Sequence, residues 1–511
     1  YKRYVERCFR SSVMDFDDLL LKTNELLNKF PEVLSKYQDK FRYILVDEYQ
    51  DTNYSQYLII KALSDRHQNL CVVGDDSQSI YSFRGANIDN ILNFKKHYPD
   101  CKTYKLEQNY RSSNNIVQCA NSLIQNNQFK LDKTIWTQNS DGEKITINKS
   151  ISDSDEGRFV ASDIFERKNN EFLSNSSFAV LYRTNAQSRA VEDALRKINI
   201  EYQVFGGLSF YQRKEIKDIL AYLRLIENLN DEESLRRIIN FPSRGIGQTT
   251  LDKLTLVSER QNISLFDSIS NLNDPSVKIN KGTIEKLENF RNQILSFKVF
   301  SQNNNAYETV SHIINKIQIV NFYKNEGSLE SFNRIENIEE LVNGINDFIE
   351  GQEELFESDK SLSRYLEDVA LYSETDKQVS NEKVSLMTVH MAKGLEFPIV
   401  YVLGMEENLF PSIMSINSRE EVEEERRLFY VAMTRAEKSL TLSYCNQRFK
   451  WGNLIECEPS RFLSEIDNKY TNKNSLDQQQ PSHIDNTLLR LRNFKKRKNI
   501  SKLKSFKSSS Q

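Results

Sequence analysis

Short apolar runs that stop abruptly at polar residues or glycine constrain the fold of this chain more than any other feature. The clearest four runs are Phe41–Val46, Leu70–Val73, Phe178–Tyr182 and Pro398–Leu403, and they end at Asp47-Glu48, Gly74-Asp75, Arg183-Thr184 and Gly404. Buried runs of this length, separated by stretches of helical character, are typical of parallel β-sheets. Ligands of such sheets bind beyond the carboxyl ends of the strands. The polar residues that end the runs are therefore the first candidates for a functional site.

A long segment in the middle of the chain has a different pattern. From about Tyr211 to Thr375 the strand pattern disappears, and segments such as Glu215–Glu227 and Glu336–Glu350 carry apolar residues at helical spacing. We therefore expect an all-helical insertion that divides one α/β domain into two sequence segments.

Composition excludes several classes of protein. The 511 residues contain no apolar run long enough to span a membrane. The cysteines show no CxxC pair and no histidine cluster, which argues against a structural metal and a disulfide framework and favours a reducing cytoplasm. They are Cys8, Cys71, Cys101, Cys119, Cys445 and Cys457. The net charge of −3 does not by itself indicate nucleic-acid binding, but a basic groove can be offset by acidic outer helices.

The acidic pair Asp47-Glu48 stands at the end of the first apolar run, in the stretch ILVDEYQDTN. Neighbouring carboxylates repel one another unless a cation or a proton relay uses them. A nucleotide hydrolase needs such a pair, with one acid on Mg²⁺ and the other orienting the attacking water. A solvated turn is the simpler interpretation of a bare Asp-Glu pair, but the length of the stretch favours the hydrolase.

The second run leads into Gly74-Asp75-Asp76-Ser77-Gln78-Ser79-Ile80-Tyr81-Ser82-Phe83-Arg84-Gly85-Ala86. Aromatic faces stack on bases of any sequence, and a nearby arginine adds positive charge. Tyr81 and Phe83 could instead be core residues, but their polar surroundings favour contact with bases.

These two stretches begin a series of motifs that resembles the superfamily 1 helicases of the UvrD, PcrA and Rep type. The series continues with Asn109-Tyr110-Arg111-Ser112, then with Thr388 to Pro411 (TVHMAKGLEFPIVYVLGMEENLFP), and closes with Glu424 to Ala436 (EERRLFYVAMTRA). Connecting pieces match as well, including DFDDLL, VLYRTNAQSR, GGLSFYQRKEIKD and FPSRGIGQTTL, so the resemblance covers about Asp15 to Phe462.

The resemblance implies an α/β fold of two RecA-like parallel-sheet domains, the first of them incomplete, with an all-helical insertion in the second. The implied boundaries are 1–14 for a remnant of a first inserted helical domain, 15–104 for the first RecA-like ATPase domain, 105–210 with 376–470 for the second, 211–375 for the insertion, and 471–511 for a flexible basic tail. We leave open whether the tail, basic from Arg490 to Lys507, contacts DNA or is simply solvated.

The resemblance also assigns nucleotide-site roles. Asp47 would hold Mg²⁺, Glu48 would activate the water, Gln78 would sense the γ-phosphate, Tyr110 would stack on adenine, Arg111 would reach the γ-phosphate, Glu396 would bind the ribose, and Arg435 would be the arginine finger. For the two arginines, a surface ion pair is the simpler alternative.

On the DNA side, the resemblance implies that Tyr81, Phe83, Arg84 and His390 contact single-stranded bases. Phe83 stands where the family usually has Trp, so we expect a weaker grip at that step. Trp451 is expected to stack on a base or, about equally, to cap a hydrophobic edge. Gly245 and Gly247 form a G-x-G turn before a helix, where exposed N–H groups suit a phosphate of the duplex.

A phosphate-binding loop of the form GxxxxGK followed by Ser or Thr should precede the Asp-Glu strand. Neither Gly-Lys-Ser nor Gly-Lys-Thr occurs in the 511 residues. We therefore expect this sequence to be part of a longer or split gene product, and we expect residues 1–511 alone to hydrolyse ATP negligibly.

The expected function is that of an ATP-dependent 3′→5′ DNA helicase or translocase acting in DNA repair or replication restart in the cytoplasm, with ATP and Mg²⁺ as cofactors. Its expected partners are single-stranded DNA, junctions of single-stranded and double-stranded DNA, and repair or replication proteins. A helicase-nuclease is disfavoured, because only a polar tail follows Phe462. The remaining alternative is a non-catalytic DNA-binding remnant or subunit of a split helicase.

Overall fold

The computed structural model describes residues 1–271, 279–354, 359–375, 382–450 and 453–474. Trp451 and most of the expected basic tail, from residue 475 onward, lie outside the described residues. Among the described residues, no helix is both long enough and apolar enough to cross a membrane.

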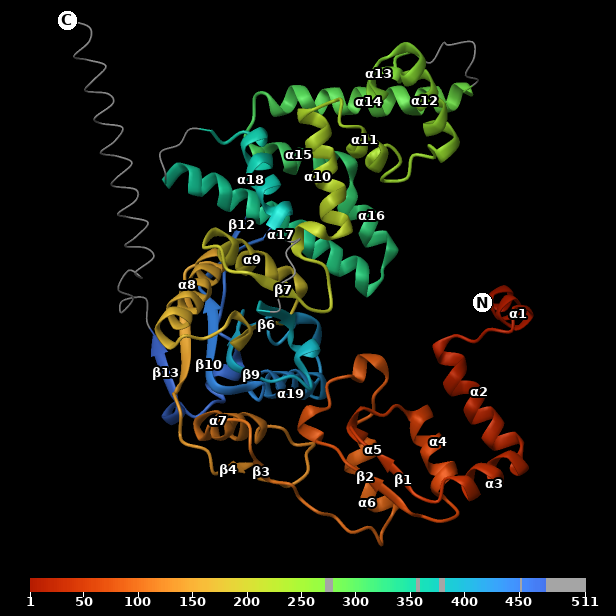
Figure 1. The fold of residues 1–511 in the computed structure, drawn as a ribbon, viewed down its shortest axis with the longest axis vertical. Coiled ribbons are helices and arrows are strands. Elements are labelled where there is room, and N and C mark those ends of the chain that lie inside the picture. Colours follow the sequence, from red (N-terminus) through yellow and green to blue (C-terminus); the bar gives the residue numbers. More distant parts are fainter. Residues whose placement is uncertain (272–278, 355–358, 376–381, 451–452, 475–511) are drawn as a thin grey trace, which may run out of the picture.

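The N-terminal part of the chain is a small α/β unit, here called the first lobe (Figure 1). Its two strands, β1 (Ile44–Val46) and β2 (Leu70–Val72), pair in parallel with Ile44 opposite Leu70. The helices of this part are α1 (Lys2–Arg10), α2 (Phe16–Lys29), α3 (Pro31–Lys40), α4 (Tyr54–Ser64), α5 (Asp89–Leu92) and α6 (Phe94–His97). Helix α4 begins where Asn53 and Gln56 cap each other's backbone N–H groups, an arrangement that satisfies two N–H groups that the helix itself leaves free.

The second lobe is built on a seven-stranded parallel sheet in the order β13-β5-β10-β9-β6-β8-β7. The strands are β5 (Ile145–Ser150), β6 (Phe178–Tyr182), β7 (Tyr202–Val204), β8 (Val384–Thr388), β9 (Phe397–Val402), β10 (Ala436–Cys445) and β13 (Thr471–Asn474). Every residue of β6 is buried, as expected for a central strand covered on both faces. The fold class inferred from the apolar runs is therefore confirmed.

Helices cover both faces of this sheet. Apolar side chains of α8 (Asp153–Glu171) and α9 (Ser188–Lys197) pack on one face. Those of α7 (Asn114–Ile124) and α19 (Arg419–Met433) pack on the other. The remaining elements of this lobe are β3 (Gln108–Asn109), β4 (Trp136–Thr137), the hairpin β11 (Gln447–Lys450) with β12 (Asn453–Glu456), and α20 (Arg461–Ser464). The last motif of the sequence is thus a helix packed directly on the sheet.

The segment between β7 and β8 forms a separate helical layer above the second lobe (Figure 1). Its helices are α10 (Lys214–Glu227), α11 (Glu232–Ile238), α12 (Gln248–Gln261), α13 (Leu265–Ser268), α14 (Lys281–Ser301), α15 (Ala306–Ile317), α16 (Ile319–Glu326), α17 (Leu329–Glu354) and α18 (Leu362–Thr375). They share one apolar core. The two segments predicted to be helical from their periodicity lie in α10 and α17.

A buried arginine joins this insertion to the second lobe. Arg189 of α9 is 3% exposed and forms ion pairs with carboxylates of both parts, namely Asp153, Asp193, Glu340 and Asp347. Gly344 of α17 faces it, and a β-carbon there would lie 2.9 Å from the guanidinium. The missing side chain lets the helix backbone approach Arg189.

The C-terminal end of the described chain differs from the expected tail. Thr471–Asn474 forms β13 and pairs in parallel with β5 at the edge of the sheet. The side chains of these four residues are all polar, so no hydrophobic pattern predicts a strand here. Backbone pairing with β5 places them in the sheet, and the boundary expected at residue 471 is wrong for these residues.

Candidate active site

The acidic pair lies at the carboxyl end of β1, beside the glycine and aspartate that follow β2. Glu48 adopts a left-handed conformation, with φ of 51°, and its N–H donates to Asp47 Oδ1 at 2.8 Å. Gln50 links the two strand ends, because its Nε2 donates to Glu48 Oε2 at 2.5 Å and its Oε1 accepts from Asp75 N at 3.0 Å. A β-carbon on Gly74 would collide with the Gln50 amide. A larger residue at position 74 would therefore have to displace the Gln50 amide that links the two strand ends.

Asp47 suits a divalent cation. Its side chain is exposed and, among the described residues, only its Oδ1 accepts a hydrogen bond. Mg²⁺ prefers carboxylate oxygens together with water and phosphate oxygens. One free carboxylate oxygen beside Glu48 fits that preference.

Gln78 lies in a short 3-10 turn, Asp76–Gln78, that follows β2. Its Nε2 donates to Asp75 Oδ2 at 2.8 Å, while the N–H of Ser77 donates to Asp75 Oδ1 at 3.0 Å. Asp75 therefore caps the turn and fixes the carboxamide of Gln78.

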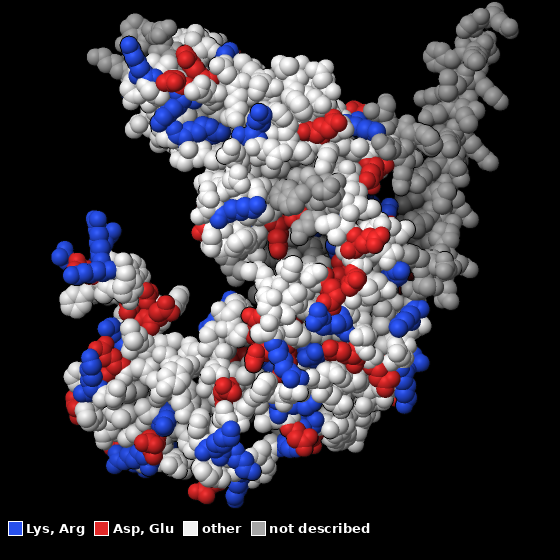
Figure 2. All heavy atoms as spheres, turned by 180° about the vertical axis from the view of Figure 1, so that it is seen from behind, with Lys and Arg blue, Asp and Glu red and all other residues white. Residues whose placement is uncertain are grey.

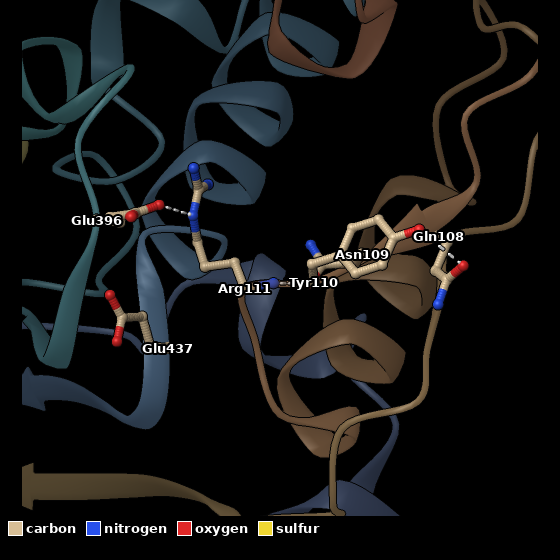
Figure 3. Close-up of a pocket in the computed structure, with 6 residues that line it drawn as sticks. All are labelled: Gln108, Asn109, Tyr110, Arg111, Glu396 and Glu437. Carbon is tan, nitrogen blue, oxygen red and sulfur yellow. Dashed lines mark hydrogen bonds and ion pairs between the residues drawn. The ribbon is translucent and has the colours of Figure 1, made fainter.

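The second lobe contributes a pocket of about 560 Å³ lined by Gln108, Asn109, Tyr110, Arg111, Glu396 and Glu437. Figure 3 shows Arg111 reaching toward Glu396, while the ring of Tyr110 lies beside Gln108. Tyr110 is 78% exposed, so its ring face is free to stack. Arg111 Nε donates to Glu396 Oε2 at 2.6 Å, and a terminal nitrogen donates to the carbonyl of Thr434 at 3.2 Å. Three of the predicted nucleotide residues thus share one pocket.

Arg435 lies close to this pocket but is directed into its own lobe. It is 2% exposed, and its guanidinium donates to the carbonyls of Val431 at 3.1 Å and Leu395 at 2.9 Å. Burial and the neighbouring charge of Arg111 lower the pKa of Arg435 to about 10. The structure brings the two predicted arginines together, but the hydrogen bonds of Arg435 run to its own lobe and not to Asp47 or Glu48.

Lys393, which sequence reasoning did not select, joins the two lobes at the centre of the site. Its Nζ donates to Asp51 Oδ2 at 2.5 Å and to the carbonyl of Gln78 at 2.6 Å, and lies 3.8 Å from Glu48 Oε2. The same ammonium lies 5.2 Å from the centre of the Tyr81 ring. Its place between His390 and Glu396, both selected, was the available sequence clue.

An aromatic cluster lies on the other side of Lys393. The Phe83 ring meets His390 edge-on at 5.4 Å, Tyr81 lies 6.0 Å from Phe83, and the Arg84 guanidinium lies 5.5 Å from the Phe83 centroid. Phe83 is 58% exposed, whereas Tyr81 also packs against the core of the second lobe. The core interpretation of Tyr81 therefore describes part of its surroundings, while its contact with bases stays a prediction.

His390 is held in its neutral form. Burial, with the nearby charges of Arg183 and Arg84, lowers the pKa of His390 to about 3. Its ring is therefore an uncharged face within the aromatic cluster at neutral pH.

Helix α19 touches this cluster from the second lobe through residues that sequence reasoning missed. Glu424 accepts from the backbone N–H of Ser82 at 3.0 Å and from its hydroxyl. Arg427 Nε donates to the carbonyl of Ser79 at 2.8 Å. The last motif of the sequence is therefore in contact with the aromatic motif of the first lobe.

The two glycines of the G-x-G turn lie apart from these residues, in the helical insertion. Gly245 has φ of 71°, and Gly247 is the N-cap of α12. Arg244 holds the turn by donating to several carbonyls, including that of Phe241 at 2.8 Å. Figure 2 shows Lys and Arg side chains on the face of the insertion that borders the open notch of the molecule. The turn thus forms a second feature of the molecule, separate from the residues around Lys393.

Comparison with known proteins connects this geometry to described families. The family model of the UvrD-like helicase C-terminal domain matches residues 104–447, and that of the UvrD/REP helicase N-terminal domain matches residues 1–99. The chain is 43% identical over 468 residues to a protein from Staphylococcus aureus (strain Mu50) described as ATP-dependent DNA helicase PcrA. A protein of the same description from Staphylococcus epidermidis is 43% identical over 470 residues. Each alignment covers 91% of this chain and 63% of the relative, so the chain spans less than two thirds of their length.

Proposed function

Because the chain belongs to the UvrD-like helicase family, we propose that it provides the second motor domain and part of the first of an ATP-dependent DNA helicase. Movement along DNA is proposed to run 3′→5′, in repair or replication restart. The observation that carries this proposal is the position of Lys393. Its ammonium lies beside Glu48 of the acidic pair, the carbonyl of Gln78 and the Tyr81 ring of the aromatic cluster, and it also pairs with Asp51. A change at the nucleotide can thus reach the DNA-facing residues through direct contacts.

The nucleotide is proposed to lie between the lobes. Tyr110 presents an exposed ring to the base, and Glu396 and Arg111 face the same pocket. Bound Mg²⁺ would neutralise charge on the phosphates, and Asp47 is the carboxylate that would hold it. Glu48 would orient the attacking water.

Nucleotide binding must rearrange three of these side chains. Arg111 and Glu396 are paired with each other, yet the first is proposed to contact phosphate and the second ribose. Arg435 donates to the backbone carbonyls of Val431 and Leu395 in its own lobe, so it must also turn before it can stabilise charge on a transferring phosphoryl group. We propose that both changes accompany closure of the lobes on the nucleotide, and that this closure is how binding produces movement.

Single-stranded DNA is proposed to cross the aromatic cluster. Stacking on Phe83, Tyr81 and His390 would accept any base, and Arg84 would add attraction to the strand. The turn around Gly245 and Gly247 is proposed to meet the duplex ahead of the junction, because its N–H groups lie at the start of α12.

Two assays test this function. Residues 1–511 should bind a fluorescent single-stranded oligonucleotide with little base preference, and the affinity should fall as salt is added. The full gene product that contains these residues should hydrolyse ATP faster when DNA is present and unwind a duplex with a 3′ single-stranded tail. DNA binding without hydrolysis by that full product would instead support a non-catalytic subunit, and absence of DNA binding would overturn the proposal.

A further inference from the structure

A strap of the second lobe, residues 127–133 between α7 and β4, is tied at one end to α19. The side chain of Asn127 donates to the carbonyl of Glu423 at 3.1 Å. The Glu423 carboxylate in turn accepts from the backbone N–H groups of Gln128 at 3.0 Å and Phe129 at 3.3 Å. This end of the strap is therefore fixed to the helix that leads to Arg435.

The other end of the strap reaches the turn that carries Gln78 in the first lobe. The backbone N–H of Leu131 donates to Asp76 Oδ2 at 2.9 Å. The ammonium of Lys133 donates to a carboxylate oxygen of both Asp75 and Asp76. Asp75 also accepts from Gln78 Nε2 at 2.8 Å. The strap and the hydrogen bonds at its two ends thus connect α19 to the carboxamide of Gln78.

Burial makes the contact between Lys133 and the two carboxylates depend on charge. The side chain of Asp76 is 1% exposed and that of Lys133 is 18% exposed. Burial alone would lower the pKa of Lys133, but the two carboxylates outweigh it and raise the pKa, so the ammonium stays charged. The buried carboxylate of Asp76, with the partly buried carboxylate of Asp75 beside it, would be strongly unfavourable without this cation. The geometry of Asp75 therefore depends on whether Lys133 is present.

We propose that Lys133 is a positioning residue of the second lobe that fixes the Gln78 carboxamide through Asp75. The proposal rests on the proposed function and on the role that the helicase resemblance implies for Gln78, which is to sense the γ-phosphate. Lys133 and Asp75 belong to different lobes, so the carboxamide is held in this way only while the lobes are docked. A shift of α19 would therefore move the strap and change the position of the Gln78 carboxamide.

The first test follows backbone hydrogen exchange in residues 1–511 and does not depend on hydrolysis. Lys133→Gln should accelerate exchange in peptides that contain Ser77 and Leu131 by about tenfold or more, because both N–H groups donate to the tethered carboxylates. Lys133→Arg should stay close to wild type. Lys130→Gln is the matched control, since the exposed Lys130 ammonium donates only to the carbonyl of Gln125 among the described residues. Unchanged exchange in Lys133→Gln would refute the tether.

The second test measures ATP hydrolysis by the full gene product. Lys133→Gln should lower the DNA-stimulated kcat about tenfold, while KM for ATP and Kd for single-stranded DNA change less than about twofold. Lys133→Arg should restore at least half of the rate. A wild-type kcat in Lys133→Gln, with only the melting temperature lowered, would show a purely structural contact and overturn the proposal.

A double variant distinguishes loss of the Lys133–Asp75 contact from a simple imbalance of charge. It can also be used if Lys133→Gln folds poorly. Lys133→Met with Asp76→Asn removes one charge of each sign and leaves Asp75 free of its cation. It should lose kcat like the single variant, and a wild-type rate would overturn the proposal. If the wild-type gene product shows no DNA-stimulated hydrolysis, the proposed function fails, but the exchange experiment still decides whether Lys133 holds the Asp75 turn.

Discussion

Lys393 donates a hydrogen bond of 2.5 Å to Asp51 Oδ2 across the boundary between the two lobes. The other oxygen of Asp51 is buried and has no hydrogen-bond partner among the described residues. Burial raises the pKa of Asp51 even though the ammonium of Lys393 opposes that shift. The ammonium is therefore the main compensation for a partly buried carboxylate, and it contributes to the docking of the lobes.

Replacing this lysine should loosen the boundary between the lobes. Lys393→Met leaves Asp51 without its donor, so we expect a loss of about 1–3 kcal/mol in the free energy of unfolding. Urea denaturation of residues 1–511 measures it, with Lys95→Met, at an exposed position of the first lobe, as the control. Equal stability of the two variants would contradict the assigned role.

The neutral state of His390 makes stability depend on pH. Its pKa is lowered to about 3 in the folded chain, whereas an unfolded histidine titrates near about 6.5. Between these values the unfolded state binds more protons, so stability falls as pH is lowered through about 6.5 and is fully retained above it. From pH 7 to pH 5 we expect His390 to account for a loss of about 2 kcal/mol. In denaturation experiments, the free energy of unfolding of His390→Asn should fall by about 2 kcal/mol less than that of wild type from pH 7 to pH 5. If the free energies of both proteins fell in parallel with pH, the assignment to His390 would be wrong.

Tyr81 should contribute to DNA binding as well as to packing. Stacking on a base implies that Tyr81→Ala weakens binding of a short single-stranded oligonucleotide by about 1–3 kcal/mol. Tyr54→Ala removes a tyrosine that is 63% exposed on α4 and should leave affinity unchanged. Fluorescence anisotropy gives both dissociation constants. If Tyr81→Ala lowers the melting temperature but leaves affinity intact, Tyr81 is a core residue only.

The joint between the insertion and the second lobe should be sensitive to a single substitution. Arg189→Met leaves four carboxylates around an apolar side chain, and loss of one partner of a buried ion pair costs about 3–5 kcal/mol. Gly344→Ala should also destabilise, because its β-carbon would lie 2.9 Å from the Arg189 guanidinium. Gly351→Ala, on the same helix with open space around it, is the matched control in a thermal denaturation series. Equal melting temperatures for the two glycine variants would show that the Arg189 side chain can move aside without loss of stability.

The parts of the fold that follow from burial were predictable from the sequence. The run Phe178–Tyr182 became a fully buried central strand, because only a strand covered on both faces needs five apolar residues in succession. Helical spacing likewise located α10 and α17. The strand Thr471–Asn474 was not predictable, since backbone pairing with β5 and not side-chain burial holds it in the sheet.

The sequence motifs selected candidate residues of the site, but they did not predict which side chains and carbonyls those residues contact. Tyr110, Arg111 and Glu396, three residues that the motifs selected, line one pocket. Lys133 and Lys393 were missed because each finds its carboxylates in a sequence segment far from its own. The direction of Arg435 was also beyond reach, because backbone carbonyls decide it and these leave no mark in the sequence.

The groups of the proposed nucleotide site are divided between the two lobes. Asp47 and Glu48 belong to the first lobe, Arg111 and Arg435 to the second, and the 511 residues contain no Gly-Lys-Ser or Gly-Lys-Thr that would hold the β- and γ-phosphates. Positioning and electrostatics are nearly all that phosphoryl transfer requires of a protein. We therefore expect negligible ATP hydrolysis by residues 1–511, with or without DNA, in a coupled phosphate-release assay.

Once a phosphate-binding loop is present in the same polypeptide, hydrolysis should become DNA-stimulated. Glu48→Gln should then abolish turnover and leave ATP binding intact, because it removes the group that orients water and not the groups that hold phosphate. Arg435→Ala should slow hydrolysis by roughly a thousandfold or more, as expected for a side chain that acts on the transition state. Arg435 is also buried, so the melting temperature of each variant must be measured beside its rate. Strong DNA-stimulated hydrolysis by residues 1–511 themselves would contradict this account, because their acids and arginines would then suffice without the loop.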